Sequence, residues 1–476
     1  MNLRDSVQVM LSSASGRLGM VFLATLVLVS AYVLVRFPMD FGPRRWNNPA
    51  QWVDNPKAAP PVWWSAFRRD AFVPHVVLTG GEPSSGQIVG GQERLYTFAY
   101  DHGRRLPPTF MAFVLSDVRF FDRPPVVSVE VVRPDGRSVT LLQIVVRGPR
   151  LGESPPYLRY QEAPFRVNLS ENQESVDAVS SMVRRDFGVA LTPAQLQGKL
   201  EEALFGIPEE GSPGEFQSLN GTYQFNVRAL VGNASDTLGG VKLILGGTAY
   251  GAMGTDALGR DLALGLLFGF PVALAIGVST SLLATAIGTF LGIVSGFMGG
   301  KTDILIQRLS DVWSNIPLLP ILIFLIFILG QKLWLVVVIM ILFGWPGLTI
   351  VVRSMVLQIR TGQLVEATQA LGASRMRIMF RHILFQIAPF VFAQMIFFTP
   401  AAILAEAGLS FLGLGDPSIP TWGQILESGF RTGAVYVGYW WWVLPPGLLI
   451  VATAMTFALV TLSLEPVLNP RLRTMR

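Results

Sequence analysis

The chain has 476 residues, of which 51% are hydrophobic and only 14% charged, and its mean hydropathy is +0.46. This composition is too apolar for an ordinary soluble protein and indicates a membrane protein. The chain contains no cysteine, which excludes disulfides, thiolate metal sites and a cysteine nucleophile. Its net charge of +5 is dispersed, without a basic face interleaved with aromatics, so nucleic-acid binding is not indicated.

The first apolar run covers residues 18–35 and lies between Arg17 and Arg36, just long enough to cross a hydrocarbon core. A cleaved signal peptide is the alternative reading. The run ends in Arg36-Phe-Pro38 without a small-x-small cleavage site, so a retained anchor helix is favoured. Residues 1–39 are therefore expected to form the cytoplasmic N-terminus and the first transmembrane helix.

Residues 40–245 contain most of the charge of the chain and predict a large soluble insert outside the cytoplasm. The alternating segments 126–132 and 138–146, joined by the turn Pro134-Asp-Gly136, predict a β-hairpin. A further alternating segment, 221–231, predicts another strand. These strands indicate a sheet-rich domain.

Two segments of this insert, 174–187 and 192–204, have the pattern of amphipathic helices, which makes the expected fold of the insert α+β. Four tryptophans follow the first apolar run: Trp46, Trp52, Trp63 and Trp64. They are expected either at the membrane surface, where amphipathic rings are favoured, or in the core of the insert.

Residues 246–476 predict the remaining five helices of an all-α polytopic core with six transmembrane helices in total. A flat elbow at 262–270 is expected because residues 262–300 carry no charge and exceed the length of one perpendicular span. The remaining spans are expected at 271–296, 312–331, 333–352 (with a kink at Gly344-Trp-Pro346) and 383–405, with the last drawn from 432–464.

The distribution of Lys and Arg predicts the orientation of these helices. With the amino terminus inside, the short cytoplasmic segments carry Arg4, Arg17, Lys301, Arg308, Arg353, Arg360, Arg375, Arg377, Arg381, Arg471, Arg473 and Arg476, whereas the two short outer loops carry Lys332 and Arg431. A contrary signal comes from Arg36, Arg44 and Arg45, which flank the first span on its expected outer side.

The loop at 356–384 contains the most informative stretch, Glu366-Ala-Thr-Gln-Ala-Leu-Gly372, followed by Arg375. Good helix formers with an acidic residue near the start, stopped by a glycine, predict a short helix exposed at a membrane face. His382-Ile-Leu384 begins ten residues after Gly372. Any loop between two spans could carry such a helix, so its spacing is what makes it distinctive.

Other motifs point away from catalysis. Ser295 to Thr302 superficially matches a phosphate-binding loop, but the required first glycine and preceding strand are missing. His75, His102 and His382 are scattered, and no catalytic or metal-ligand spacing is present. Glu406, with Ser410 one turn later, is either a pathway or gate residue or an interfacial carboxylate held by loop groups.

A series of motifs occurs in order through the apolar part of the chain: Gly254-Thr-Asp-Ala-Leu-Gly-Arg-Asp261, Gly296-Phe-Met-Gly-Gly300 with Asp303 and Asp311, the Glu366–Gly372 stretch, Glu406 to Gly415, Thr421-Trp-Gly423, and Leu468-Asn-Pro-Arg471-Leu. Taken together, they resemble the signatures of the permease subunits of dipeptide/oligopeptide-type binding-protein-dependent ABC importers.

This resemblance implies a type I ABC importer permease fold in the cytoplasmic membrane. It implies alternating access driven by two ATP-binding partner subunits, a second homologous permease subunit and an extracytoplasmic substrate-binding protein, with ATP and Mg²⁺ bound by the partners and no cofactor or enzymatic activity in this chain. The residues implied to dock on the ATPases are Glu366, Ala367, Ala370, Leu371, Gly372 and Arg375. The residues implied to form an outer turn are Gly254, Thr255, Asp256, Gly259, Arg260 and Asp261.

Three departures from the family pattern stand out: Thr368 replaces a usual Ala, Phe385 replaces a usual Pro, and the insert is unusually large. The implied cargo is a peptide, with oligosaccharides, opines and nickel complexes as alternatives within the same machinery. A membrane-anchored receptor or scaffold and a stand-alone secondary transporter are the rival classes. The first needs only one span, and the second lacks a visible inverted repeat or mid-span ionisable groups.

Overall fold

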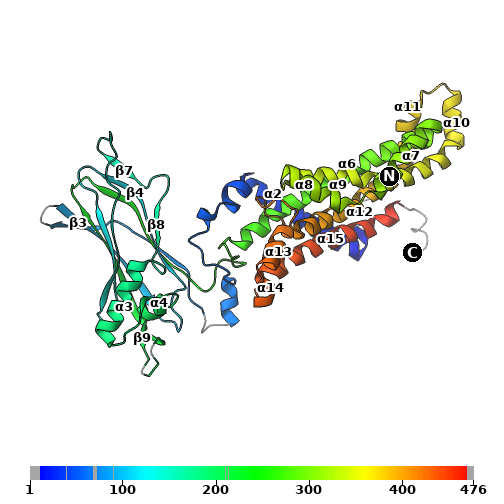
Figure 1. The fold of residues 1–476 in the computed structure, drawn as a ribbon. Coiled ribbons are helices and arrows are strands. Elements are labelled where there is room, and N and C mark those ends of the chain that lie inside the picture. Colours follow the sequence, from blue (N-terminus) through cyan, green and yellow to red (C-terminus); the bar gives the residue numbers. More distant parts are fainter. Residues whose placement is uncertain are drawn as a thin grey trace. The chain divides into compact units, whose positions relative to one another are not determined.

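The computed structural model describes residues 11–38, 40–67, 72–88, 91–209, 211–212 and 214–468. The chain forms two compact units: a helical unit made of the residues up to Pro49 and from Leu262 onward, and an insert, Ala50–Asp261 (Figure 1). The sequence-based boundaries of the insert, 40 and 245, therefore differ from those in the structure. Residues after 245 stay with the insert because Thr248 N–H bonds to Val73 O at 3.0 Å and Thr255 N–H to Ala59 O at 2.8 Å.

The insert is built on two antiparallel sheets. One sheet has the order β2 (Ser84–Ile88), β3 (Gly91–His102), β11 (Gly221–Val231), β5 (Val126–Val132), β6 (Ser138–Val145). The other has the order β1 (Val76–Thr79), β12 (Thr237–Leu245), β4 (Met111–Phe120), β7 (Tyr157–Arg159), with β8 (Phe165–Asn168) also paired to β4. A short pair, β9 (Gly206–Pro208) and β10 (Phe216–Ser218), completes the strands.

The two sheets share one apolar core. In β11 every second side chain points inward, and Tyr223, Phe225 and Val227 are fully buried together with Phe113 and Leu115 of β4. This is the period-2 pattern of a strand with one buried face. The predicted hairpin is confirmed as β5 paired with β6, and the predicted strand at 221–231 is confirmed as β11.

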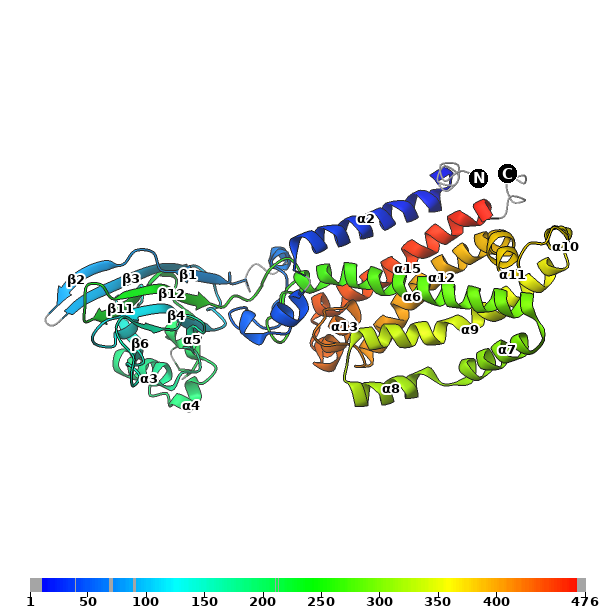
Figure 2. The ribbon, with the colours of Figure 1, turned by 90° about the horizontal axis from the view of Figure 1, so that it is seen from above.

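Three helices pack beside the sheets of the insert (Figure 2). The prediction for 174–187 is confirmed by α3 (Gln173–Phe187), which Asn172 caps at its N-terminus and Gly188 ends in the left-handed region, at φ +71°. The prediction of one helix at 192–204 is wrong. The chain forms α4 (Pro193–Leu196) and α5 (Leu200–Leu204), because Gly198 between them adopts φ +83° and interrupts the helix.

The helical unit contains α2 (Ala14–Arg36), α6 (Leu262–Met298), α7 (Gly300–Asn315), α8 (Leu318–Leu329), α9 (Leu333–Arg360), α10 (Gln363–Ala370), α11 (Arg375–Arg377), α12 (Leu384–Phe411), α13 (Trp422–Arg431), α14 (Ala434–Val437) and α15 (Trp440–Leu468). Single π-helical segments occupy Gly42–Trp46 and Ile378–Ile383. Among the described residues, five helices are long and apolar enough to cross a membrane, or six if the bent pair α7–α8 counts as one span.

The elbow expected at 262–270 is absent, because α6 is a single helix of 37 residues that continues through Pro271. Its first turns are enclosed by two indole rings. A Cβ on Gly265 would lie 2.4 Å from Trp46, and one on Gly269 would lie 2.3 Å from Trp422. The Trp422 indole also donates to the Leu266 carbonyl at 2.9 Å, so this segment is a buried helix rather than an interfacial one.

The span expected at 312–331 is also wrong, since α7 and α8 meet at a bend of 78°. Pro317 disfavours helical backbone at the preceding residue, and Ile316 is extended, with ψ 124°. Helix α9 passes through Gly344-Trp-Pro346 without interruption and ends at Arg360 rather than 352. Helix α12 extends to Phe411, so Glu406 lies inside this helix rather than after it.

Helices α6 and α9 lie side by side (Figure 2) and approach closely through a glycine stripe, Gly288, Gly292 and Gly296. A Cβ on Gly292 would lie 2.7 Å from the Val352 Cβ, and one on Gly296 would lie 2.8 Å from the Val356 Cβ. The hydroxyl of Thr349 donates to the Gly288 carbonyl at 3.1 Å. Small residues at four-residue spacing allow such close helix contact inside a membrane.

Candidate coupling site

The stretch from Glu366 to Gly372 forms the predicted short helix, α10, with Glu366 in its first turn. Gly372 ends it in the left-handed region, at φ +77°, where a side chain would be strained. Ser374 then caps α11 by accepting from Arg377 N–H at 3.4 Å. The unusual Thr368 is accommodated because its hydroxyl donates to the Leu364 carbonyl, 2.8 Å away, within the same helix.

Helix α10 is anchored to the transmembrane helices by one buried side chain, Val365. Val365 is fully buried in an apolar cluster that brings together the ends of α6 and α9 and the start of α12: Ile293, Phe297, Val352, Val356, Ile378, Met379, Ile383 and Ile387. This anchoring cluster links α10 to the same part of α6 and α9 that the glycine stripe joins. A displacement of α10 would therefore reach both helices directly.

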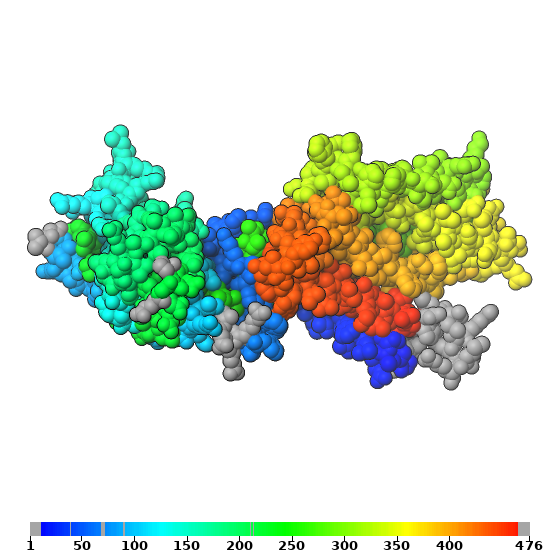
Figure 3. Space-filling view, turned by 60° about the horizontal axis from the view of Figure 1, so that its bottom comes forward, coloured from blue at the N-terminus to red at the C-terminus, as the bar shows by residue number. Residues whose placement is uncertain are grey.

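Most of α10, of α11 and of the turn between them is exposed. Leu364, Leu371 and Met376 expose 52%, 85% and 60% of their surface, and we call these three residues the exposed apolar face. The expected docking residues Glu366, Ala367, Ala370 and Arg375 are exposed beside them. This segment, yellow in Figure 3, lies at the surface at one end of the helical unit. Exposed apolar side chains on a polar helix are candidates for a protein–protein contact.

A polar cluster joins three helices near the anchoring cluster. Arg353 of α9 donates two hydrogen bonds to the Asp303 carboxylate of α7, each 2.6 Å long. Ser295 of α6 donates to the same carboxylate, and Gln307 donates to the Ser295 hydroxyl at 3.0 Å. The cluster fixes the ends of α6, α7 and α9 against one another.

Phe385, which stands where the family usually has a proline, lies in the first turn of α12. No proline marks where the span begins, and the chain is helical without a break from Arg375 to Phe411, through the turn Ile378–Ile383. Phe385 itself is 73% exposed. Helix α11 thus continues directly into α12.

The outer-turn motif forms a rigid turn within the insert. Gly254 and Gly259 adopt φ +75° and +80°, and buried Asp256 accepts from the backbone N–H of Arg260 at 2.9 Å and pairs with its guanidinium. Thr255 donates to the Pro56 carbonyl at 2.7 Å and forms an isolated bridge with Asp261. The motif ties the end of the insert to its beginning.

Glu406 and Ser410 lie one turn apart in α12, both buried, and the Ser410 hydroxyl donates to the Glu406 carboxyl at 2.7 Å. Gly415 and Gly423 pack closely against Ser410. The Glu406 carboxyl is therefore enclosed between α12, α13 and the loop joining them.

The structure thus brings the expected coupling residues together on α10, on α11 and in the turn between them, whereas the outer-turn residues and the Glu406–Ser410 pair lie on separate elements. Arg4, Arg471, Arg473 and Arg476 lie outside the described residues. Sequence reasoning missed Val365 and the Asp303–Arg353 pair, although the small residues at 288, 292 and 296 were a readable signal of close helix contact. Within the described ranges, no group of three His, Asp or Glu residues is placed to hold a metal ion.

Long apolar helices with a short exposed helix between two of them define a multi-pass membrane protein. Residues 288–474 match the family of binding-protein-dependent transport system inner membrane components. The dipeptide transport system permease protein DppC of Bacillus subtilis is 34% identical over 221 residues, covering 46% of this chain and 68% of that protein. The oligopeptide permease OppC of the same organism is also 34% identical over 221 residues, covering 46% of this chain and 72% of that protein.

OppC of Haemophilus influenzae is 32% identical over 223 residues, covering 47% of this chain and 71% of that protein. The chain belongs to the family of binding-protein-dependent transport system inner membrane components, as the motifs predicted. It is a transmembrane permease subunit of the ABC transporter class, similar to the dipeptide and oligopeptide permeases. A solved structure of the MetNI methionine ABC transporter matches 44% of this chain and 98% of its own, with 20% identity and a TM-score of 0.37.

Proposed function

We propose that this chain is one of two permease subunits of a type I ABC importer that moves short peptides across the cytoplasmic membrane by alternating access. Relatives named as dipeptide and oligopeptide permeases support a peptide cargo over oligosaccharides, opines or nickel complexes. Two ATP-binding subunits supply the energy, and an extracytoplasmic binding protein delivers the peptide. The insert faces outward and the 356–384 loop faces the cytoplasm.

The observation that carries this proposal is the exposed apolar face. Leu371 exposes 85% of its surface at the end of a helix that is anchored through Val365. A partner that covers Leu364, Leu371 and Met376 removes this apolar surface from water, which stabilises the complex by roughly 25 cal/mol per Å² of apolar area buried. The ATP-binding subunits are the partner expected there, with Glu366 and Arg375 providing charged contacts at the edge.

The anchoring cluster transmits the motion of the ATP-binding subunits from α10 to the membrane-spanning helices. When the ATP-binding subunits close, they displace α10, and Val365 transfers the displacement to α6, α9 and the start of α12. The glycine stripe joins α6 to α9 and the Asp303–Arg353 pair joins α7 to α9, so the ends of these three helices move as a unit, because close-packed interiors do not absorb such motion locally. The spans that line the pathway then exchange inward and outward openings.

The test is capture of the ATP-binding subunits by the purified permease. Leu371→Asp places a charge in the apolar contact and is expected to reduce capture at least about tenfold, the result of losing about 1.4 kcal/mol. Leu151→Asp is the matched control, since Leu151 is also fully exposed but lies in the insert. Equal capture by wild type and Leu371→Asp would refute docking at this face.

A further inference from the structure

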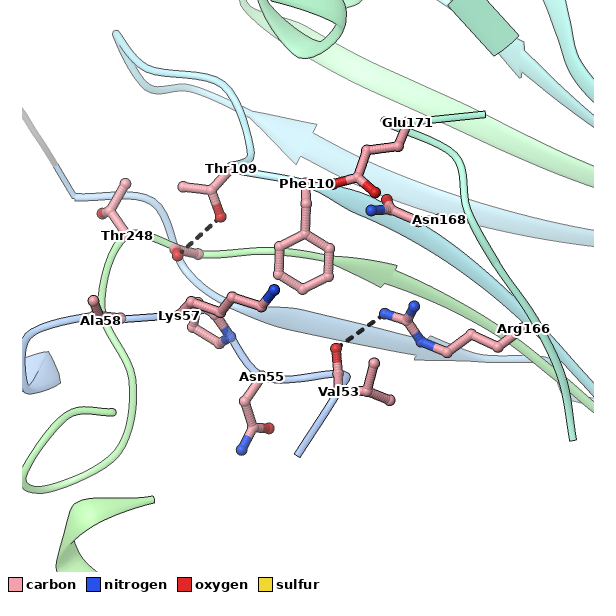
Figure 4. Close-up of a pocket in the computed structure, with 13 residues that line it drawn as sticks. Val53, Asn55, Lys57, Ala58, Thr109, Phe110, Arg166, Asn168, Glu171 and Thr248 are labelled. Atoms are coloured by element: carbon pink, nitrogen blue, oxygen red, sulfur yellow. Dashed lines mark hydrogen bonds between the residues drawn. The ribbon is translucent and has the colours of Figure 1, made fainter. Parts of the chain in front are cut away.

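A cavity of about 450 Å³ opens in the insert (Figure 4). Its walls come from four segments of the insert: the stretch 53–59, the residues at the start of β4, the end of β8 with the turn after it, and the residues that follow β12. A cavity of this volume lies in the range of small-molecule sites. No motif in the sequence pointed to it, because its lining residues are far apart along the chain.

Part of the wall is fixed by hydrogen bonds. The Arg166 guanidinium donates to the Asp54 carboxylate at 2.9 Å and to the Val53 carbonyl at 3.0 Å, which joins β8 to the 53–59 stretch. The Thr109 hydroxyl donates to the Gly247 carbonyl at 3.2 Å, which joins β4 to the segment after β12. The cavity is therefore formed before any ligand arrives.

Two charged side chains of the wall remain available. Lys57 and Glu171 both line the cavity, and the described part of the chain gives neither side chain an ion-pair partner. In Figure 4 they extend toward the cavity from different segments, and the Phe110 ring is drawn between them. Besides the Arg166 guanidinium, which is paired with Asp54, the wall thus offers an ammonium group, a carboxylate and an apolar ring.

This combination selects for one class of ligand. A simple anion is attracted by Lys57 but repelled by Glu171, and a simple cation meets the opposite pair of effects. A molecule that carries both charges and an apolar group satisfies all three features at once. We propose that the cavity is a binding site for a short zwitterionic peptide, with its carboxylate at Lys57, its ammonium at Glu171 and an apolar side chain against Phe110.

This inference rests on the proposed function, since it gives the insert a role in receiving the peptide cargo before it reaches the membrane pathway. Its test measures binding alone, by calorimetry, on the full-length chain in lipid nanodiscs without partner subunits. The probes are the dipeptide Ala-Phe, its N-acetyl form and its C-terminal amide. Wild type is expected to bind the free dipeptide about tenfold more tightly than either blocked form, because each blocked form loses one charge-assisted contact.

Two variants assign each charge to its partner. Glu171→Gln is expected to bind the free and acetylated dipeptides equally while still discriminating against the amide. Lys57→Gln is expected to bind the free and amidated dipeptides equally while still discriminating against the acetylated form. Glu162→Gln and Lys242→Gln, which remove exposed charges outside this cavity, should behave as wild type.

The inference is overturned if wild type does not bind Ala-Phe, or if both cavity variants retain the full discrimination of wild type. Uptake of labelled Ala-Phe by the complete complex, measured separately, distinguishes the two proposals. Uptake without binding in this cavity would contradict only the inference about the insert. Absence of ATP-driven uptake with intact binding in the cavity would contradict the proposed function instead.

Discussion

Arg353 of α9 and Asp303 of α7 form a two-bond ion pair in which both hydrogen bonds are 2.6 Å long. The pair lies where α6, α7 and α9 meet, and Ser295 of α6 shares the same carboxylate. It therefore couples the end of the glycine stripe to the broken helix pair α7–α8.

Removing one side of this pair should loosen the junction. Arg353→Met leaves the Asp303 carboxylate without its guanidinium, and hydrogen bonds to charged groups contribute roughly 1.5–3 kcal/mol each. We expect a lower midpoint of thermal unfolding in detergent and reduced transport. Arg308→Met is the control, because Arg308 has no ion pair among the described residues. An unchanged midpoint for Arg353→Met would show that the pair does not hold the junction.

The glycine stripe should tolerate no added methyl group. In Gly292→Ala the new Cβ would meet Val352 at 2.7 Å, so α6 and α9 must separate, and overpacking typically costs about 1–3 kcal/mol. Gly347→Ala in α9 is the matched control, since its Cβ would meet nothing within 4 Å. The measurement is again thermal unfolding, with uptake assayed in parallel. Equal losses in the two variants would mean that helix contact is not the cause.

Two substitutions at Gly372 distinguish the effect of backbone strain from the effect of blocked docking. A Cβ at this position would meet nothing within 4 Å, but φ is +77°, so Gly372→Ala should cost only about 1–2 kcal/mol of local helix stability and retain most transport. Gly372→Glu adds a long charged side chain beside Leu371 and should abolish transport and weaken capture of the ATP-binding subunits. Glu366→Lys should behave similarly while inserting normally into the membrane. Normal transport by Gly372→Glu and Glu366→Lys would exclude α10 as the coupling helix.

The proposed topology places α10 and the insert on opposite sides of the membrane. Because the chain lacks cysteine, single cysteines can be introduced without background. Ser374 is exposed, and in the insert Gln217 is a better position than the half-buried Ser218, whose hydroxyl donates to the Arg104 carbonyl at 2.7 Å. An impermeant maleimide should label the two positions from opposite faces. Labelling of both from one face would contradict the arrangement.

Burial of Glu201 should make the stability of α5 depend on pH. Burial raises the pKa of this carboxyl above 4.5, opposed by a hydrogen bond with Ser170, and one carboxyl oxygen has no partner in the described structure. Above pH 4.5 the folded state keeps a proton that the unfolded chain has lost, so the free energy of unfolding falls as pH rises through the folded pKa.

Hydrogen exchange of α5, corrected for intrinsic rates, should therefore show weaker protection at pH 8 than at pH 5. Glu201→Gln, which carries no titrating group, should remove this difference and increase protection at pH 8. A wild-type protection that is the same at both pH values would mean that Glu201 does not titrate in this interval.

Local signals in the sequence predicted the local elements well. The turn Pro134-Asp-Gly136 between alternating strands marked the β5–β6 hairpin, and Gly372 marked the end of α10. Within the long apolar runs, composition is nearly uniform, so periodicity does not show where a helix bends. The missing elbow depends on Trp46 and Trp422, which enclose α6 from distant parts of the chain.

The candidate site likewise contains residues that the sequence predicts and residues whose role depends on tertiary contacts. Its exposed residues, from Glu366 to Arg375, could be predicted because they lie close together along the chain. Val365, the residue that anchors α10, sits in the same stretch but was not singled out, because its role comes from contacts with α6, α9 and α12. The cavity lined by Lys57 and Glu171 depends wholly on tertiary contacts, and a single sequence does not show which charges they bring together.

The most direct test of the account is peptide uptake into proteoliposomes that contain this chain, its partner permease, both ATP-binding subunits and the binding protein. We expect ATP-dependent uptake that requires the binding protein. Leu371→Asp should abolish this uptake, whereas Leu151→Asp should leave it unchanged. Uptake that proceeds without ATP hydrolysis, or that survives Leu371→Asp at the wild-type rate, would contradict the claim that α10 couples partner ATPases to transport.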